Sequence, residues 1–70
     1  MAAGVLKKWN SDRGYGFIKP DGVGNDIFVH VSEFKKAQIH EPQEGDRIEF
    51  DTETGRNGSG LRAVKLTLLG

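Results

Sequence analysis

The sequence predicts a small all-β protein in which five short strands form a closed or nearly closed barrel. Apolar residues alternate with polar or glycine residues in short runs, as the period-two geometry of strands requires. Turn-forming residues separate these runs, and no segment shows a helical period beyond a single turn. A chain of 70 residues could hardly protect the free edges of an open sheet, so a closed sheet is favoured.

The first three strands are expected to form an antiparallel meander over residues 4–10, 15–20 and 26–31. The double lysine blurs the alternation of the first strand, which indicates a β-bulge near Lys8 or Trp9. Pro20 cannot donate a ladder hydrogen bond, and it therefore fits the end of a strand.

The second half of the chain is expected to contain the last two strands. Ser32 can cap a single helical turn, because its side-chain oxygen can accept a hydrogen bond from a free backbone N–H group. Residues 35–45 show neither period and are expected to form a loop. The remaining strands are predicted at 46–53 and 61–69, and a loop of turn formers connects them. The predicted core consists of Leu6, Ile18, Ile27, Val29, Ile48, Phe50, Val64, Leu66 and Leu68.

Two runs, residues 13–19 and 27–31, place aromatic residues on the face opposite this core. Period two turns Tyr15, Phe17 and Lys19 away from Gly16 and Ile18. It also turns Phe28 and His30 away from Ile27, Val29 and Val31. Once the aliphatic residues fill the barrel, no interior position is left for these outward-facing rings or for Trp9. Planar rings on a rigid sheet can stack nucleobases of any sequence, although some of them could instead cover the barrel or pack under the loop.

Charge is unevenly distributed along a chain whose net charge is zero. Cations are in excess in residues 1–20 and 55–70, whereas acids are in excess in residues 41–54. If the first and last strands lie near one another and the acidic strand is turned away, one face of the molecule would attract anions. The cations expected to contact phosphates near the aromatic runs are Lys7, Lys8, Arg13 and Lys19.

The chain contains the segments KKWN (7–10), RGYGFI (13–18) and IFVHV (27–31) and the turn EGD (44–46). These segments resemble the first strand, the two ribonucleoprotein motifs and a later turn of the cold-shock domain, the family of bacterial cold-shock proteins and Y-box proteins. The resemblance covers almost the whole chain. It implies a five-stranded antiparallel OB-fold (oligonucleotide/oligosaccharide-binding) barrel that binds single-stranded RNA or DNA and acts as an RNA chaperone. Such a domain has low sequence specificity with a preference for pyrimidines.

The resemblance also implies which residues bind. Trp9, Tyr15, Phe17, Phe28 and His30 would stack bases, and Lys7 and Arg13 would be among the backbone contacts. The full set predicted to bind nucleic acid is Lys7, Lys8, Trp9, Arg13, Tyr15, Phe17, Lys19, Phe28, His30, Arg56 and Arg62.

This sequence departs from the family pattern at several aromatic positions. We therefore expect weaker binding than in family members that carry all of these aromatic residues. Lys8 and Trp9 stand where the family commonly has tryptophan and phenylalanine, so a cation replaces one ring. Val31 stands where phenylalanine is usual, and Ile39 takes the place of an aromatic residue in the following loop. Fewer stacked bases are therefore expected, and Lys8 would restore part of the phosphate affinity.

The sequence gives little support for metal binding or catalysis. The chain has no cysteine, so it can form neither a disulfide nor a thiolate metal site, and His30 and His40 make no ligand cluster. The acidic residues of 41–53 alternate along a strand and its flanks, which indicates a solvent-exposed face. No nucleophile has a plausible base beside it. We therefore expect no enzymatic activity, no cofactor, no metal and no small-molecule substrate.

Residues 1–70 are expected to be one cold-shock domain and a monomer. The amino terminus lacks the features of a signal peptide, and no segment approaches the roughly 20 apolar residues that span a bilayer. A cytoplasmic protein is therefore expected, without membrane contact by this domain.

Three alternatives remain open from the sequence. The aromatic face could dock a peptide or a neighbouring domain. The chain could be one domain of a longer protein, including a membrane-attached one. Aromatic platforms also stack sugars, so an oligosaccharide-binding barrel is the third alternative. Salt distinguishes the first from nucleic-acid binding, because only phosphate contacts weaken linearly with the logarithm of salt concentration.

Overall fold

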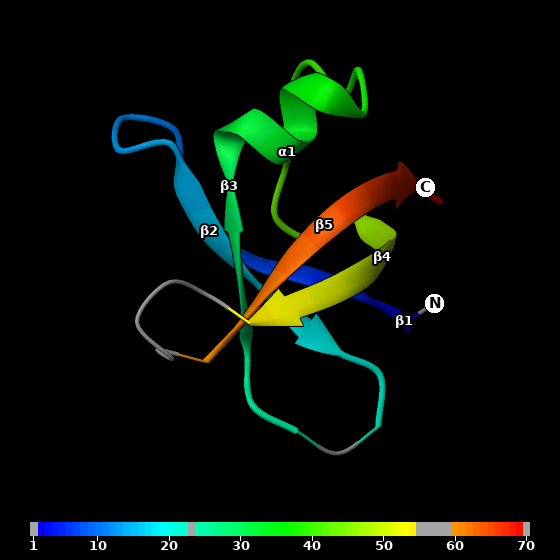
Figure 1. Ribbon diagram of the computed structural model, residues 1–70. Coiled ribbons are helices and arrows are strands. Elements are labelled where there is room, and N and C mark those ends of the chain that lie inside the picture. The colour runs from blue at the N-terminus through cyan, green and yellow to red at the C-terminus, as the bar shows by residue number, and fades with distance from the viewer. Residues whose placement is uncertain (1, 23, 55–59, 70) are drawn as a thin grey trace.

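The computed structural model describes residues 2–22, 24–54 and 60–69. Five strands close into a barrel in the order β1-β2-β3-β5-β4 (Figure 1). Their bounds are β1 (Ala2–Asn10), β2 (Tyr15–Pro20), β3 (Ile27–His30), β4 (Arg47–Thr54) and β5 (Leu61–Leu68). The predicted all-β barrel is confirmed, and every strand overlaps its predicted segment. The end of β2 at Pro20 is also confirmed.

The barrel combines antiparallel and parallel pairing. β1, β2 and β3 form the predicted antiparallel meander, and β4 pairs antiparallel with both β1 and β5. β3 and β5 run parallel. The prediction of a purely antiparallel barrel is therefore wrong for this pair. A closed ring with an odd number of strands cannot alternate in direction all the way round, so at least one neighbouring pair has to be parallel.

The first and last strands are not neighbours in this barrel. β4 lies between β1 and β5 on one side, and β2 and β3 separate them on the other. The arrangement in which the acidic strand turns away from adjacent first and last strands is therefore not the one observed. As a consequence, acids of β4 lie beside cations of β5.

Two register shifts mark where strand alternation breaks. In β1 the pairing passes from Leu6 with Ile18 to Lys8 with Phe17, which leaves Lys7 as an extra residue. The predicted bulge near Lys8 is thus confirmed. In β5 a second shift occurs at Lys65, whose φ of 54° lies in the left-handed region.

The bulge at Lys65 changes the inward face of β5. Ala63 and Leu66 are buried three positions apart, and Val64 turns outward opposite Asp51. Leu68 lies opposite Ile48 but remains 46% exposed. The prediction of Val64 and Leu68 as core residues is therefore wrong, and the remaining predicted core residues are confirmed. An extra residue shifts the two-residue period by one, which an even alternation along the sequence cannot reveal.

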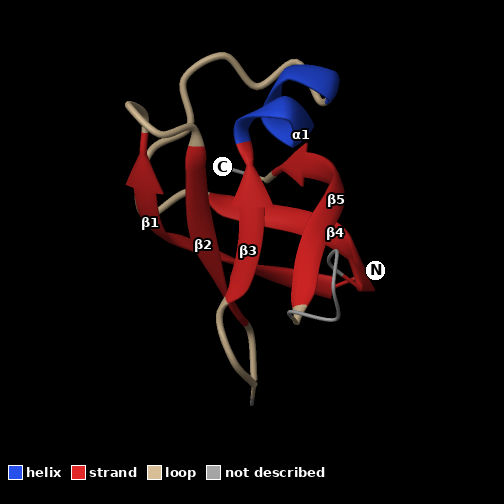
Figure 2. Ribbon diagram, turned by 60° about the vertical axis from the view of Figure 1, so that its left-hand side comes forward, coloured by secondary structure: helices blue, strands red, loops and turns tan. Residues whose placement is uncertain are grey.

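A short helix, α1 (Val31–Lys36), covers one end of the barrel (Figure 2). It begins after His30, whose Nδ1 accepts a hydrogen bond from the backbone N–H of Ser32 at 3.2 Å. The cap is therefore His30, and the prediction of Ser32 as the cap is wrong. Phe34 is only 1% exposed and belongs to the core, although it was not among the predicted core residues. In the described part of the chain, no helix is long and apolar enough to cross a membrane.

Candidate nucleic-acid interface

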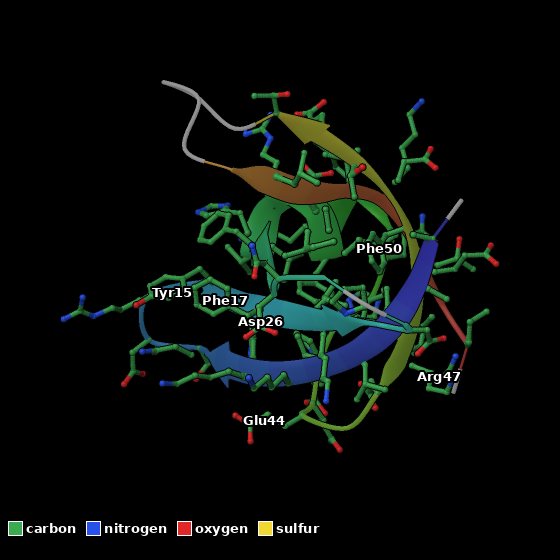
Figure 3. All side chains as sticks on the ribbon, turned by 90° about the horizontal axis from the view of Figure 1, so that it is seen from below. Tyr15, Phe17, Asp26, Glu44, Arg47 and Phe50 are labelled. Atoms are coloured by element: carbon green, nitrogen blue, oxygen red, sulfur yellow. The ribbon has the colours of Figure 1, made fainter. Side chains whose placement is uncertain are left out.

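An aromatic face, formed by Tyr15, Phe17 and Phe28, covers the outer side of β2 and β3. Phe17 pairs directly with Phe28 across the two strands, and Tyr15 pairs with His30. The intervening residues of both strands are buried, while the three rings are half-buried and His30 is exposed. Figure 3 shows Tyr15 and Phe17 along β2 and Phe50 within the ring of strands. The predicted division into an aromatic and an aliphatic face is therefore confirmed.

A row across four strands joins this face to two cations. Lys8 of β1 pairs with Phe17, Phe17 with Phe28, and Phe28 with Arg62 of β5. Paired residues of neighbouring strands point to the same side of a sheet. The row Lys8–Phe17–Phe28–Arg62, called the aromatic row below, therefore presents two rings with a cation at each end.

The three rings form one contiguous cluster. Tyr15 and Phe28 have ring centroids 5.8 Å apart with planes inclined by 29°. Phe17 meets Tyr15 edge to face at 6.2 Å and Phe28 edge to face at 6.0 Å. In an edge-to-face contact the rim of one ring lies against one face of the other, and the contact leaves the opposite face of that second ring uncovered. The cluster holds the rings in place and still presents π-surface to solvent.

His30 continues the face beyond Tyr15. Its Nδ1 accepts the hydrogen bond from the backbone of Ser32 and lies 3.0 Å from the Ser32 hydroxyl oxygen. These contacts tie the imidazole to the start of α1. The capping role thus gives an exposed ring a defined position at the end of β3.

Trp9 does not lie on the aromatic face. The bulge at Lys7 turns Lys8 outward beside Phe17 and pairs Trp9 with Gly16, whose position is buried. The indole packs edge to face against Phe34, with ring centroids 4.9 Å apart. The expectation that Trp9 has no interior position is therefore wrong, because α1 and Phe34 provide one.

Gly16 is what lets Trp9 approach β2. A Cβ atom at Gly16 would lie 2.2 Å from the carbonyl oxygen of Lys8 and 2.8 Å from Cε3 of Trp9. Neither distance is compatible with a side chain. The glycine between Tyr15 and Phe17 is therefore required by the packing of β1 on β2 rather than by flexibility.

The turn between β1 and β2 positions Arg13. The Asn10 side chain accepts a hydrogen bond from the backbone N–H of Arg13 at 3.1 Å, and Gly14 donates to the Asn10 carbonyl at 2.9 Å. Gly14 has a φ of 72°, a conformation that favours glycine. Asn10 itself pairs with Tyr15, so the exposed Arg13 extends from the end of the aromatic face.

Some of the predicted cations are already paired with acids. Lys7 Nζ lies 3.1 Å from Asp26, and Arg62 forms an ion pair with Glu53. Among the described residues, none forms an ion pair with Lys8, Arg13 or Lys19, all of which are exposed. The predicted binding residue Arg56 lies outside the described residues.

A further ion pair lies on the opposite side of the barrel. Arg47 contacts Asp21 at 2.7 Å, and Figure 3 shows Arg47 far from Tyr15. The hydrogen bond that Arg47 donates to Asp21, and then the negative charge of Asp21, raise the pKa of Arg47 above its ordinary value. Since arginine is charged at every accessible pH, this shift does not change the charge of Arg47.

Glu53 is the residue near the site that the sequence did not single out. It lies opposite Arg62 in the hairpin of β4 and β5. Antiparallel pairing of the two predicted strands about their connecting loop would have placed these residues close together.

In the described residues, no three His, Cys, Asp or Glu side chains gather to hold a metal ion.

The closed five-stranded barrel with an aromatic face flanked by cations defines an OB-type binding barrel. Residues 2–69 match the family described as the 'Cold-shock' DNA-binding domain. The chain belongs to the cold-shock domain family, a family of nucleic-acid-binding domains that are not enzymes.

Known proteins resemble the chain over most of its length. The major cold shock protein of Micrococcus luteus is 44% identical over 69 residues, which are 99% of this chain and 100% of that protein. Cold shock protein ScoF of Streptomyces coelicolor is 43% identical over 83% of this chain and 87% of its own length. Glycine-rich protein 2 of Nicotiana sylvestris is 38% identical over 94% of this chain but only 30% of its own length.

Proposed function

We propose that this protein binds single-stranded RNA and DNA by stacking bases on Tyr15, Phe17, Phe28 and His30, and that it acts as an RNA chaperone of low sequence specificity. Lys8, Arg13, Lys19 and Arg62 contact the phosphates. Residues 1–70 act as one domain that is monomeric and cytoplasmic, without a cofactor, a small-molecule substrate or a catalytic step.

The aromatic row is the observation that supports this proposal most directly. Rings at its centre offer π-faces to bases, and Lys8 and Arg62 at its ends offer charge to the connecting phosphates. In a duplex the bases are already stacked and paired, so only unpaired strands gain from these rings. A protein that traps unpaired segments lowers the free energy of open RNA relative to folded RNA.

Rapid exchange follows from the small number of available cations. Non-sequence-specific binding draws on stacking, which tolerates any base, and on phosphate contacts. Because Lys7 and Arg62 already form ion pairs with acidic residues, electrostatic attraction alone binds a strand weakly. Weak attachment allows the RNA to be released, as a chaperone requires.

Trp9 has a limited part in this proposal. Its indole packs on Phe34 rather than beside Phe17, so it is not a member of the stacking set. The lysine before it occupies the position in the aromatic row where the resemblance expects a ring. Three aromatic rings and one imidazole therefore carry the stacking.

The proposal is tested by titrating fluorescently labelled oligo-dT with the protein and measuring anisotropy at several salt concentrations. We expect binding whose log–log salt slope is shallow, between about −2 and −3, because each of the four phosphate contacts on a single strand contributes about −0.7 and the contact of Arg62 is reduced by its ion pair with Glu53. A label on the DNA is preferable to the intrinsic signal, since Trp9 is not on the aromatic face.

Competitors separate the alternatives in the same experiment. Unlabelled oligo-dA should compete, whereas a duplex of equal length and a neutral oligosaccharide should not. Displacement by the oligosaccharide would instead indicate a sugar-binding barrel. Absence of binding to every single strand would contradict the proposal and leave the peptide-docking alternative.

Replacing Lys8 by tryptophan should strengthen binding. A new ring beside Phe17 adds one stacking position worth about 1–3 kcal/mol, and the loss of a phosphate contact offsets part of this gain. We expect an increase in affinity for oligo-dT of up to about tenfold and a salt slope shallower by about 0.7. Anisotropy titrations with K8W measure both quantities.

Lys35→Trp is the matched control, because it makes the same chemical change on the exposed surface of α1. It should leave the affinity close to that of the unaltered protein. Equal gains from K8W and K35W would show that the aromatic row has no special place for a base.

A further inference from the structure

Arg62 lies at the end of the aromatic row, next to Phe28 in the parallel pair of β3 and β5. Its side chain is 44% exposed, so a phosphate of a strand stacked on Phe28 can reach it. The guanidinium group is suited to this contact, because its planar array of N–H donors matches the oxygens of a phosphate.

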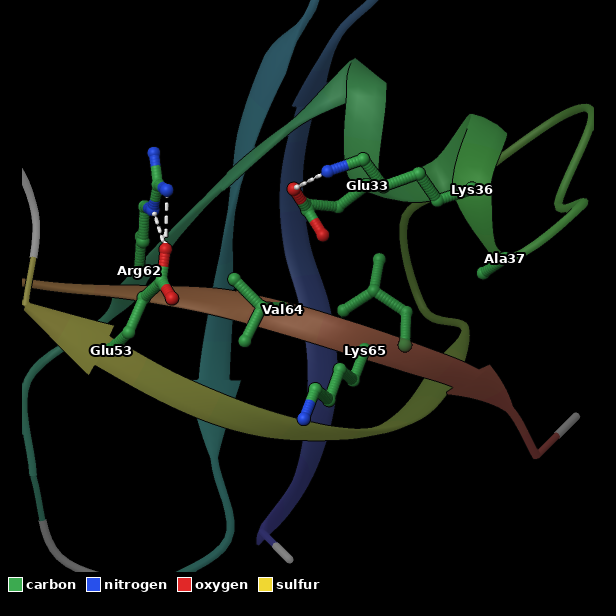
Figure 4. Close-up of a pocket in the computed structure, with 8 residues that line it drawn as sticks. Glu33, Lys36, Ala37, Glu53, Arg62, Val64 and Lys65 are labelled. Atoms are coloured by element: carbon green, nitrogen blue, oxygen red, sulfur yellow. Dashed lines mark hydrogen bonds and ion pairs between the residues drawn. The ribbon is translucent and has the colours of Figure 1, made fainter.

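Glu53 already occupies this guanidinium. Arg62 Nε donates to Glu53 Oε1 at 2.6 Å, and the terminal Nη2 contacts the same oxygen (Figure 4). Carboxylate and phosphate oxygens bind the same N–H donors of arginine. A phosphate can use these donors only if the carboxylate moves away.

The surroundings of the pair allow that exchange. Glu53 is 46% exposed, and ion pairs as open to solvent as this one are weak. Both residues line a groove of about 610 Å³ between α1 and β5, which also includes Lys36 and Val64 (Figure 4). The open groove gives the Glu53 carboxylate room to turn away when a phosphate arrives.

We propose that Glu53 competes with the nucleic-acid phosphate for Arg62 and thereby sets the affinity and salt sensitivity of single-strand binding. This inference rests on the proposed function. A phosphate that binds Arg62 first has to displace Glu53, and this cost reduces the free energy gained from the phosphate contact. Base stacking on Phe28 is unaffected. The competition therefore lowers the contribution of charge to the binding free energy and leaves the contribution of stacking, so that stacking supplies a larger share of the affinity.

The test is the Glu53→Gln variant, which keeps the size of the side chain but removes its charge. We expect oligo-dT affinity to rise by about two- to fivefold, the amount that corresponds to a weak exposed ion pair. The salt slope should steepen by about 0.7, because Arg62 becomes a full phosphate contact.

Two controls isolate the role of Arg62. Glu49→Gln removes an equal charge from the same strand at a residue opposite Ala3 and Thr67, and it should leave the salt slope unchanged. In an Arg62→Gln background, Glu53→Gln should no longer steepen the slope. Trp9 fluorescence, which reports the packing against Phe34, checks that all variants are folded.

Equal effects of E53Q and E49Q would overturn the inference, since they would reflect net charge alone. A steeper slope that persists without Arg62 would overturn it as well. Unchanged binding by E53Q, with normal oligo-dT binding by the unaltered protein, would refute only the competition. Failure of the unaltered protein to bind any single strand would refute the proposed function, and the competition with it.

Discussion

Replacing Phe17 or Phe28 by alanine is expected to weaken oligo-dT binding by about 1–3 kcal/mol each, which is at least about fivefold. The two rings pair directly across β2 and β3 and form the centre of the aromatic row. Each truncation removes one surface on which a base stacks. It also removes the edge-to-face contact that holds the other ring, so the double variant should lose more than either single one.

Anisotropy titration at constant salt measures these losses. The salt slope should stay unchanged in both variants, because the phosphate contacts are intact. Leu68→Ala is the matched control: it truncates an apolar side chain that is 46% exposed on β5 and lies away from the aromatic face. If the aromatic variants remain folded and bind as L68A does, stacking on β2 and β3 is ruled out.

Replacing Phe34 by alanine is expected to lower the free energy of unfolding by about 3–5 kcal/mol. Phe34 is 1% exposed, fills the end of the barrel under α1 and meets the Trp9 indole. The truncation leaves a cavity between the helix and the strands. Small domains have little stability in total, so much of that stability would be lost.

Denaturant unfolding followed by Trp9 fluorescence and by circular dichroism measures this loss. Phe28→Ala is a control of identical chemistry on the half-exposed aromatic face, and its cost should be only about 1 kcal/mol, the worth of its ring contacts. Similar unfolding free energies for F34A and F28A would show that Phe34 is not a core residue.

Much of the fold could be read from local patterns. Alternation predicted all five strands, since each side of a strand meets one environment and the residues record it every second position. The same period placed Tyr15, Phe17 and Phe28 outward and Ile18, Ile27 and Val29 inward, and the structure agrees. These statements concern neighbours along the chain, and for that reason they needed no knowledge of the tertiary structure.

Features that depend on distant segments were predicted poorly. The side on which Trp9 lies depends on the bulge at Lys7 and on the presence of Phe34 at the barrel end. The inward face of β5 depends on the bulge at Lys65, where two residues face one position of β4. Neither the burial of Phe34 nor that of Ala63 follows from its own neighbours.

The sequence by itself determined the class of the fold, the family resemblance and the aromatic face, because strand period and motif residues are local. Only the tertiary structure decided that Lys8 and Arg62 end one row with Phe17 and Phe28, and that Glu53 holds Arg62. Both arrangements depend on how separate strands are aligned in a closed barrel. That alignment follows from the register, the bulges and the parallel pair that an odd number of strands requires.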